Sequence, residues 1–121
     1  MTRILVVDDS PTETHVLKTM LEKHGYEVSI AEDGDQGMAL ARSERPAVIL
    51  MDIVMPGMNG FQATRKLSRD PETSDIPIVI ISTKDQDTDR IWAKRQGAQE
   101  YISKPVTEDE LLGKIGAVLN G

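Results

Sequence analysis

Two stretches of this chain indicate its fold: Ile4-Leu5-Val6-Val7-Asp8-Asp9 and Val48-Ile49-Leu50-Met51-Asp52. Each is a short apolar run that ends abruptly in carboxylates, which is typical of a buried parallel strand whose carboxyl end opens into a site. Three carboxylates gathered at strand ends repel one another, so they require a hard cation or must take up protons. The pair Lys104-Pro105 follows another short apolar segment and supplies a fixed positive charge opposite the acids.

Size and composition exclude several classes of protein. The chain has 121 residues, so we expect residues 1–121 to form a single domain without an output domain. A net charge of −6 argues against direct binding to nucleic acid or to an anionic membrane surface. We see no membrane span and no secretory signal. Cysteine is absent, which fits a reducing compartment, and we expect a cytoplasmic protein.

Strand and helix patterns alternate five times along the chain. Strands are expected near residues 4–7, 28–30, 48–51, 78–81 and 101–102. This alternation predicts an α/β fold with a doubly wound, five-stranded parallel sheet and helices on both faces. In such sheets a ligand binds at the carboxyl ends of the strands, where the strand order reverses.

Sequence signals also mark where helices begin and which residues they bury. Ser10-Pro11-Thr12-Glu13 and Thr107-Glu108-Asp109-Glu110 each match a capping box. A further helix is expected from about residue 35 to residue 43, and the stretch 68–77 is expected to be a surface loop. The buried faces of the first and last helices are predicted to consist of Val16, Leu17, Met20 and Leu21, and of Leu111, Leu112, Ile115, Val118 and Leu119.

Five motifs in this order resemble the receiver domain of bacterial two-component response regulators. They are Val6-Val7-Asp8-Asp9-Ser10, the stretch 51–60, Ile80-Ile81-Ser82, Gly97-Ala98, and Tyr101 with Lys104-Pro105. The resemblance covers the whole chain and implies a flavodoxin-like receiver fold with strand order 2-1-3-4-5. Residues 8–13, 60–65 and 92–98 are most similar to the stand-alone, chemotaxis-like regulators of type IV pilus (twitching) systems.

The resemblance gives the site residues expected roles. Asp52 is the expected phosphoacceptor, whose carboxylate attacks phosphorus and forms an acyl phosphate. Asp8, Asp9, Asp52 and the backbone carbonyl of Val54 are the expected ligands of Mg²⁺, with Mn²⁺ also suitable, because the set contains only oxygen. Lys104 and the Ser82 hydroxyl are expected to bond phosphoryl oxygens, and the Lys104–Pro105 peptide is expected to be cis.

Each of these residues also has an ordinary structural interpretation. A strand-end aspartate is often a turn residue or a helix cap, and Asp9 could cap the helix that begins near Ser10. A serine after a strand is often a simple cap, and a lysine before a proline is commonly solvated. Thr83 occupies a position where the family usually has alanine or glycine, so access to the site is expected to be narrower.

The resemblance also implies a switch and partners. Tyr101 matches the family's aromatic switch position: Ser82 moves toward the phosphoryl group, and Tyr101 fills the vacated space. The surface formed by the fourth helix, fifth strand and fifth helix then changes. Trp92 and Tyr101 are the expected partner contacts there, and partial packing is the other interpretation of Trp92. The expected partners are a CheA-like histidine kinase as phosphodonor and a downstream motility or signalling protein. We expect a monomer that signals or acts as a phosphate sink.

Other functions fit the residues less well. A Mg²⁺-dependent phosphohydrolase that forms an aspartyl phosphate would need a second aspartate at the position of Val54. A flavodoxin-like carrier would cradle phosphate where this chain has Asp8-Asp9, and no P-loop motif occurs. We therefore expect no enzyme activity beyond the protein's own phosphoryl transfer and autodephosphorylation. A pseudo-receiver, which keeps the fold for protein contacts without phosphorylation, stays open as the alternative.

Overall fold

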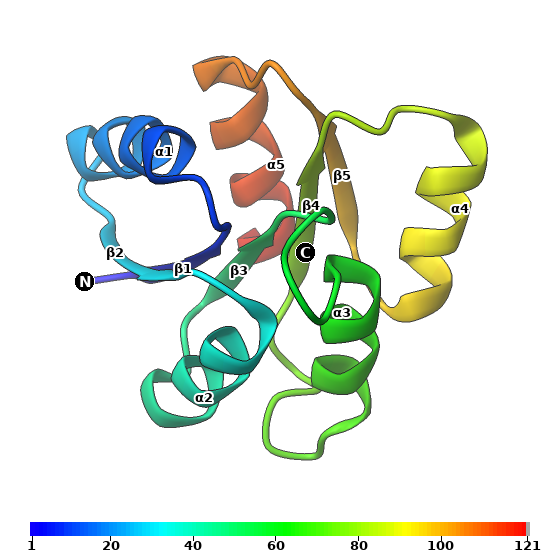
Figure 1. Cartoon of the computed structure of the whole chain (residues 1–121). Coiled ribbons are helices and arrows are strands. Elements are labelled where there is room, and N and C mark those ends of the chain that lie inside the picture. The colour runs from blue at the N-terminus through cyan, green and yellow to red at the C-terminus, as the bar shows by residue number, and fades with distance from the viewer. Residues whose placement is uncertain (121) are drawn as a thin grey trace.

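One parallel sheet of five strands, in the order β2-β1-β3-β4-β5, organises the computed structural model, which describes residues 1–120 (Figure 1). The strands are β1 (Arg3–Val7), β2 (Glu27–Ala31), β3 (Val48–Met51), β4 (Ile78–Ser82) and β5 (Glu100–Ser103). The helices are α1 (Pro11–Lys23), α2 (Gly34–Glu44), α3 (Gly60–Arg69), α4 (Asp87–Gln96) and α5 (Glu108–Asn120). The predicted doubly wound α/β fold and its strand order are confirmed.

The helices cover both faces of the sheet (Figure 1). On one face, Ile4 and Val6 pack with Leu21 of α1 and Leu111 of α5. On the other face, a second apolar cluster joins the sheet to α2, α3 and α4, and its members include Leu5, Val7, Ala41, Ala63 and Ala93. Because β1 and β3 are buried on both sides, almost every position in them is apolar, and an acid can follow only where the strand leaves the core.

The order of the strands reverses between β1 and β3, which lie side by side at the centre of the sheet. Backbone hydrogen bonding continues one residue past each strand: Asp8 N–H donates to Ala31 O at 3.0 Å, and Asp52 N–H donates to Val7 O at 2.9 Å. These bonds fix both aspartates at the same edge of the sheet. The expected position of a ligand site is therefore occupied by acids.

The loop between β3 and α3 brings Gly60 back against the backbone of Asp52 and Ile53. Gly60 N–H donates to Ile53 O at 2.8 Å, and a Cβ atom at Gly60 would overlap the carbonyl oxygen of Asp52. Asn59 and Gln62 form a reciprocal capping box at the start of α3, with both bonds at 2.9 Å. Glycine at position 60 thus lets α3 begin against the backbone of Asp52.

Two expectations about local packing were wrong. Val16 is 46% exposed and Leu119 is 38% exposed, because the sheet-facing stripe of α1 runs through Thr14, Leu17 and Leu21, whereas α5 buries only Leu111 and Ile115.

Most of the stretch 68–77 is a surface loop, as expected, although α3 continues to Arg69. The Thr73 hydroxyl donates to the Leu67 carbonyl at 2.7 Å, and both Thr73 and Ile76 are buried, which closes the end of α3.

The other predicted boundaries agree with the structure to within two residues. Asp33 caps α2, which is one residue longer at each end than expected. Thr107 Oγ1 accepts from Glu110 N–H at 3.2 Å, which is one of the two bonds of the capping box predicted for α5. Among residues 1–120, no helix combines the length and the apolar character that a membrane crossing needs.

The close approach of α3 to Asp52 gives a stability prediction with an internal control. Gly60→Ala should lower the free energy of unfolding by about 2–3 kcal/mol, because the added methyl group meets backbone rather than a movable side chain. Gly113 lies in α5 with open space around it, so Gly113→Ala should raise stability by about 0.5–1 kcal/mol. Urea denaturation measures both. A Gly60→Ala variant as stable as the parent would contradict this packing.

Candidate functional site

Three carboxylates meet at the carboxyl ends of β1 and β3. Oxygen atoms of Asp8, Asp9 and Asp52 lie within 4.8 Å of one another, with Asp8 and Asp52 buried and Asp9 exposed. Asp8 is held in place because its Oδ1 accepts the Ser10 N–H at 2.9 Å. The acids that the sequence predicted to converge are therefore brought together.

Lys104 places its ammonium group over the buried acids. Its Nζ lies 3.2 Å from Asp52 Oδ1 and 3.5 Å from Asp8 Oδ2. The backbone helps to fix the residue, since Lys104 N–H donates to Ser82 O at 2.8 Å. The Lys104–Pro105 peptide is cis, which confirms the prediction.

Glu13 belongs to this group, although the sequence assigned it only to a helix cap. Its Oε2 lies 2.7 Å from Lys104 Nζ, nearer than either aspartate. The capping box is therefore half formed: Glu13 N–H donates to Ser10 Oγ at 3.3 Å, while the Glu13 side chain turns to Lys104. No sequence signal pairs two residues that stand 91 positions apart.

Burial without a full complement of positive charge shifts the pKa values of the site. Burial raises the pKa of Asp8 to about 6. The charge of Asp52 also raises this pKa, whereas the hydrogen bond from the Ser10 N–H lowers it. Burial also raises the pKa of Asp52, although Lys104 opposes that shift. For Lys104, burial lowers the pKa, but Glu13, Asp52 and Asp8 together raise it above its usual value.

This donor set fits a small hard cation. Its ligand atoms are all carboxylate oxygens, and no histidine or cysteine belongs to the group, a composition that favours Mg²⁺ or Mn²⁺ over Zn²⁺. Burial and the charge of Asp52 both raise the pKa of Asp8, so the ionised form of this carboxyl is disfavoured in the site. A divalent ion would offset this effect.

Ser82 and Tyr101 are joined through the backbone of one residue, Lys84. Ser82 is buried and its Oγ accepts the Lys84 N–H at 3.1 Å, while the Tyr101 hydroxyl donates to Lys84 O at 2.5 Å. The Tyr101 ring is only 6% exposed, and the Arg90 guanidinium lies 4.8 Å from its centroid. The Tyr101 ring is thus buried in the protein, and it presents little surface to a partner in this arrangement.

Trp92 differs from Tyr101 in this respect. It is 46% exposed, and the neighbouring Ile91 is exposed as well. The buried side of α4 consists of Ala93 and Gln96. Of the two residues proposed as partner contacts, Trp92 is therefore the accessible one.

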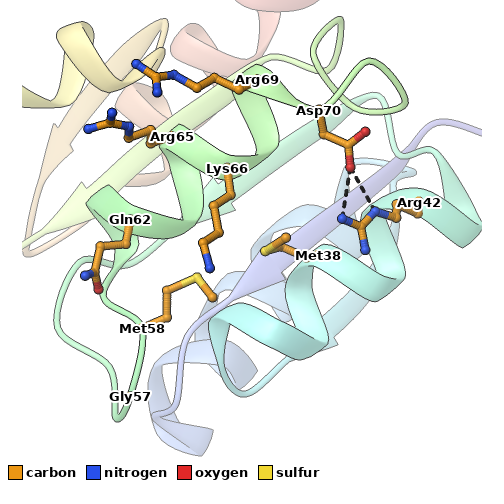
Figure 2. A pocket seen from close by; sticks show the side chains of 9 residues that line it. All are labelled: Met38, Arg42, Gly57, Met58, Gln62, Arg65, Lys66, Arg69 and Asp70. Carbon is orange, nitrogen blue, oxygen red and sulfur yellow. Dashed lines mark hydrogen bonds and ion pairs between the residues drawn. The ribbon is translucent and has the colours of Figure 1, made fainter.

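A separate groove of about 880 Å³ lies away from the acids, along α2, α3 and the loop between β3 and α3 (Figure 2). Figure 2 shows Arg42 of α2 paired with Asp70 at 2.9 Å, and Lys66 of α3 extending toward Met58. None of the strand-end acids lines this groove. Asp8 and Asp9 instead border a smaller hollow of about 280 Å³ beside α1.

Clustered acids at the ends of β1 and β3, with a lysine after β5 on a doubly wound sheet, define the receiver class of signalling domains. Residues 4–116 match the family model described as the response regulator receiver domain. The chain belongs to this family.

Known proteins place the chain more closely. It is 64% identical to Protein PilH of Pseudomonas aeruginosa over 100% of both chains. It is 42% identical to the response regulator PleD of Caulobacter vibrioides, over 93% of this chain and 25% of that protein.

Solved structures agree with this relationship. The chemotaxis protein CheY4 of Vibrio cholerae superposes with a TM-score of 0.93 at 31% identity, covering 98% of this chain and 99% of that one. The receiver domain of the sensor histidine kinase PA1611 of Pseudomonas aeruginosa, which has a magnesium ion coordinated in its active site cleft, gives a TM-score of 0.91 at 29% identity, with coverage of 99% and 98%.

The pKa of Asp8 predicts how stability depends on pH without divalent cations. Between about pH 4 and about pH 6, the Asp8 carboxyl is protonated in the folded protein and ionised in the unfolded chain. At this carboxyl the folded state therefore binds more protons, so Asp8 contributes a fall in the free energy of unfolding as the pH rises through this window. Urea denaturation in the presence of a chelator measures this slope.

Two variants test the assignment of that slope. Asp8→Asn should make the pH dependence less steep, because its amide does not titrate, while Asp52, whose pKa is also raised, still contributes. Asp109→Asn removes an exposed acid from the start of α5 and should leave the slope unchanged. An unchanged slope in Asp8→Asn would show that other groups cause it.

Proposed function

We propose that this protein is a single-domain response regulator that accepts a phosphoryl group from a CheA-like histidine kinase onto Asp52. The observation that carries the proposal is the convergence of Asp8, Asp9 and Asp52 opposite Lys104 in a receiver fold. The similarity to PilH over the full length of both chains also supports the proposal.

The chemistry follows from the carboxylate of Asp52. One of its oxygens attacks the phosphorus atom, the bond from phosphorus to the donor breaks, and the leaving group keeps the electron pair. Lys104 lies 3.2 Å from Asp52 Oδ1, so its ammonium group is in place to stabilise negative charge on the transferred group. The Ser82 hydroxyl would bond a further phosphoryl oxygen.

Asp8, Asp9, Asp52 and the Val54 carbonyl would hold Mg²⁺, or Mn²⁺ in its place. The bound ion would neutralise oxygens of the incoming phosphoryl group. The receiver domain of PA1611, with magnesium in its active site cleft, supports this choice of metal. Oxygen atoms of Asp8, Asp9 and Asp52 lie within 4.8 Å of one another, and the group contains no histidine or cysteine, which also supports this choice.

The proposed output surface consists of α4, β5 and α5. Ser82 and Tyr101 both bond to the backbone of Lys84, so a movement of Ser82 toward a phosphoryl group would shift the carbonyl that anchors Tyr101. The effect of such a shift on a partner can be no larger than the difference in the partner's affinity for the phosphorylated and unphosphorylated states. Trp92 of α4 is exposed, and we propose it as an aromatic contact for a partner that binds there.

The pathway that we propose is the control of motility. The similarity to PilH favours a type IV pilus (twitching) or chemotaxis-like system. Within it, the protein would either signal to a motility component or drain phosphoryl groups from a shared kinase, as a cytoplasmic monomer. Its own phosphoryl transfer and autodephosphorylation would be its only catalytic steps.

Labelling by acetyl phosphate in the presence of Mg²⁺ tests the proposal. The parent protein should take up one phosphoryl group through an acid-stable, base-labile bond, as an acyl phosphate requires. Asp52→Asn should abolish labelling, because an amide is not a nucleophile toward phosphorus, whereas Asp109→Asn should label as the parent does. Stoichiometric labelling of Asp52→Asn would exclude this site, and no labelling of the parent would favour the pseudo-receiver.

A further inference from the structure

The contacts of Lys104 rank its three carboxylate partners. Glu13 Oε2 lies at 2.7 Å from Nζ, Asp52 Oδ1 at 3.2 Å and Asp8 Oδ2 at 3.5 Å. An ammonium group has three N–H donors, and here all three acids draw on them. In this structure, therefore, the best hydrogen bond of Lys104 goes to an acid that belongs neither to the metal ligands nor to the phosphoacceptor.

The three acids differ in their access to water. The side chain of Glu13 is 42% exposed, whereas those of Asp52 and Asp8 are 10% and 3% exposed. Separation from Lys104 would leave a buried carboxylate without an opposite charge, which is costly, but Glu13 can exchange the ammonium group for water. Glu13 is thus the partner that Lys104 can leave at the lowest cost.

The surroundings of the pair leave room for that exchange. Glu13 and Lys104 line a hollow of about 220 Å³ together with Val16, Ile81, Pro105 and three further residues. Glu13 sits in the first turn of α1, where Ser10 caps the backbone through the Glu13 N–H. The side chain can therefore swing into solvent while the start of the helix stays intact.

We propose that Glu13 is a positioning residue that competes with the phosphoryl group on Asp52 for Lys104. This inference rests on the proposed function. Before phosphorylation, Glu13 holds the ammonium group. Transfer of a phosphoryl group replaces the single charge of the Asp52 carboxylate by the larger charge of the phosphoryl oxygens, which draws Lys104 to them and releases Glu13 to water.

The competition gives a rate effect of defined sign. Glu13→Gln removes the charge that competes for Lys104, and it also removes the repulsion of the anionic donor. Acetyl phosphate should therefore label this variant about two- to fivefold faster than the parent, which is the factor expected for a partly exposed ion pair. Glu13→Ala, whose side chain cannot hydrogen bond to Lys104, should be labelled at least as fast as Glu13→Gln. Glu22→Gln makes the same charge change on an exposed residue of the same helix and should label at the parental rate.

A stability measurement without divalent cations or phosphodonor separates the ion pair from a capping role. The shift in melting temperature caused by Glu13→Gln should be more unfavourable in the parent than in a Lys104→Gln background, because only the parent loses the attraction to Lys104. A role confined to the helix cap would give the same shift in both backgrounds. Glu22→Gln should give equal shifts in both.

The outcomes are distinguishable. Faster labelling of Glu13→Gln, together with a stability shift that depends on Lys104, supports the competition. Labelling of Glu13→Gln at or below the rate of Glu22→Gln overturns the competition but not the proposed function. Equal melting-temperature shifts for Glu13→Gln in the parent and in the Lys104→Gln background do the same. Failure of the parent to label overturns the proposed function and the competition with it, whereas the stability shifts still show whether Glu13 and Lys104 form a pair.

Discussion

The deficit of positive charge at the carboxyl ends of β1 and β3 is the constraint on which the site depends. Asp8, Asp52 and Glu13 all contact the single ammonium group of Lys104, and Asp9 adds a further carboxylate. Burial raises the pKa of Asp8 to about 6, and the neighbouring charge of Asp52 contributes to this shift. A divalent ion and a phosphoryl group can then each change the balance, which is what a switch requires.

The fold creates this deficit as a consequence of its topology. Parallel strands that are buried on both faces have no place for an acid inside the sheet, so the first acids appear where β1 and β3 emerge. Backbone bonds from Asp8 and Asp52 to neighbouring strands hold these acids together in spite of their repulsion. Gly60 brings α3 against the carbonyl of Asp52 and so fixes the loop that follows the phosphoacceptor candidate.

The sequence predicted the sheet, its alternation with helices and the convergence of Asp8, Asp9 and Asp52, because short apolar runs ending in acids are a local signal. It did not reveal the partnership of Glu13 with Lys104, since a capping box has the same residues whether or not its glutamate turns away. Helical spacing also misplaced Val16 and Leu119, because it indicates an apolar face but not how far the sheet extends beneath it. The inward position of Tyr101 depends on contacts with Lys84 and Arg90 that no spacing reveals.

The clustered acids of this site must either take up protons or bind a divalent cation. Calorimetric titration of the protein with Mg²⁺ in two buffers of different ionisation enthalpy tests it most directly, because the buffers reveal protons released on binding. We predict release of about half a proton near pH 6, where the Asp8 carboxyl is half protonated, almost none at pH 8, and strongly weakened binding in Asp9→Ala. Binding without proton release at pH 6, or unchanged binding in Asp9→Ala, would contradict the account.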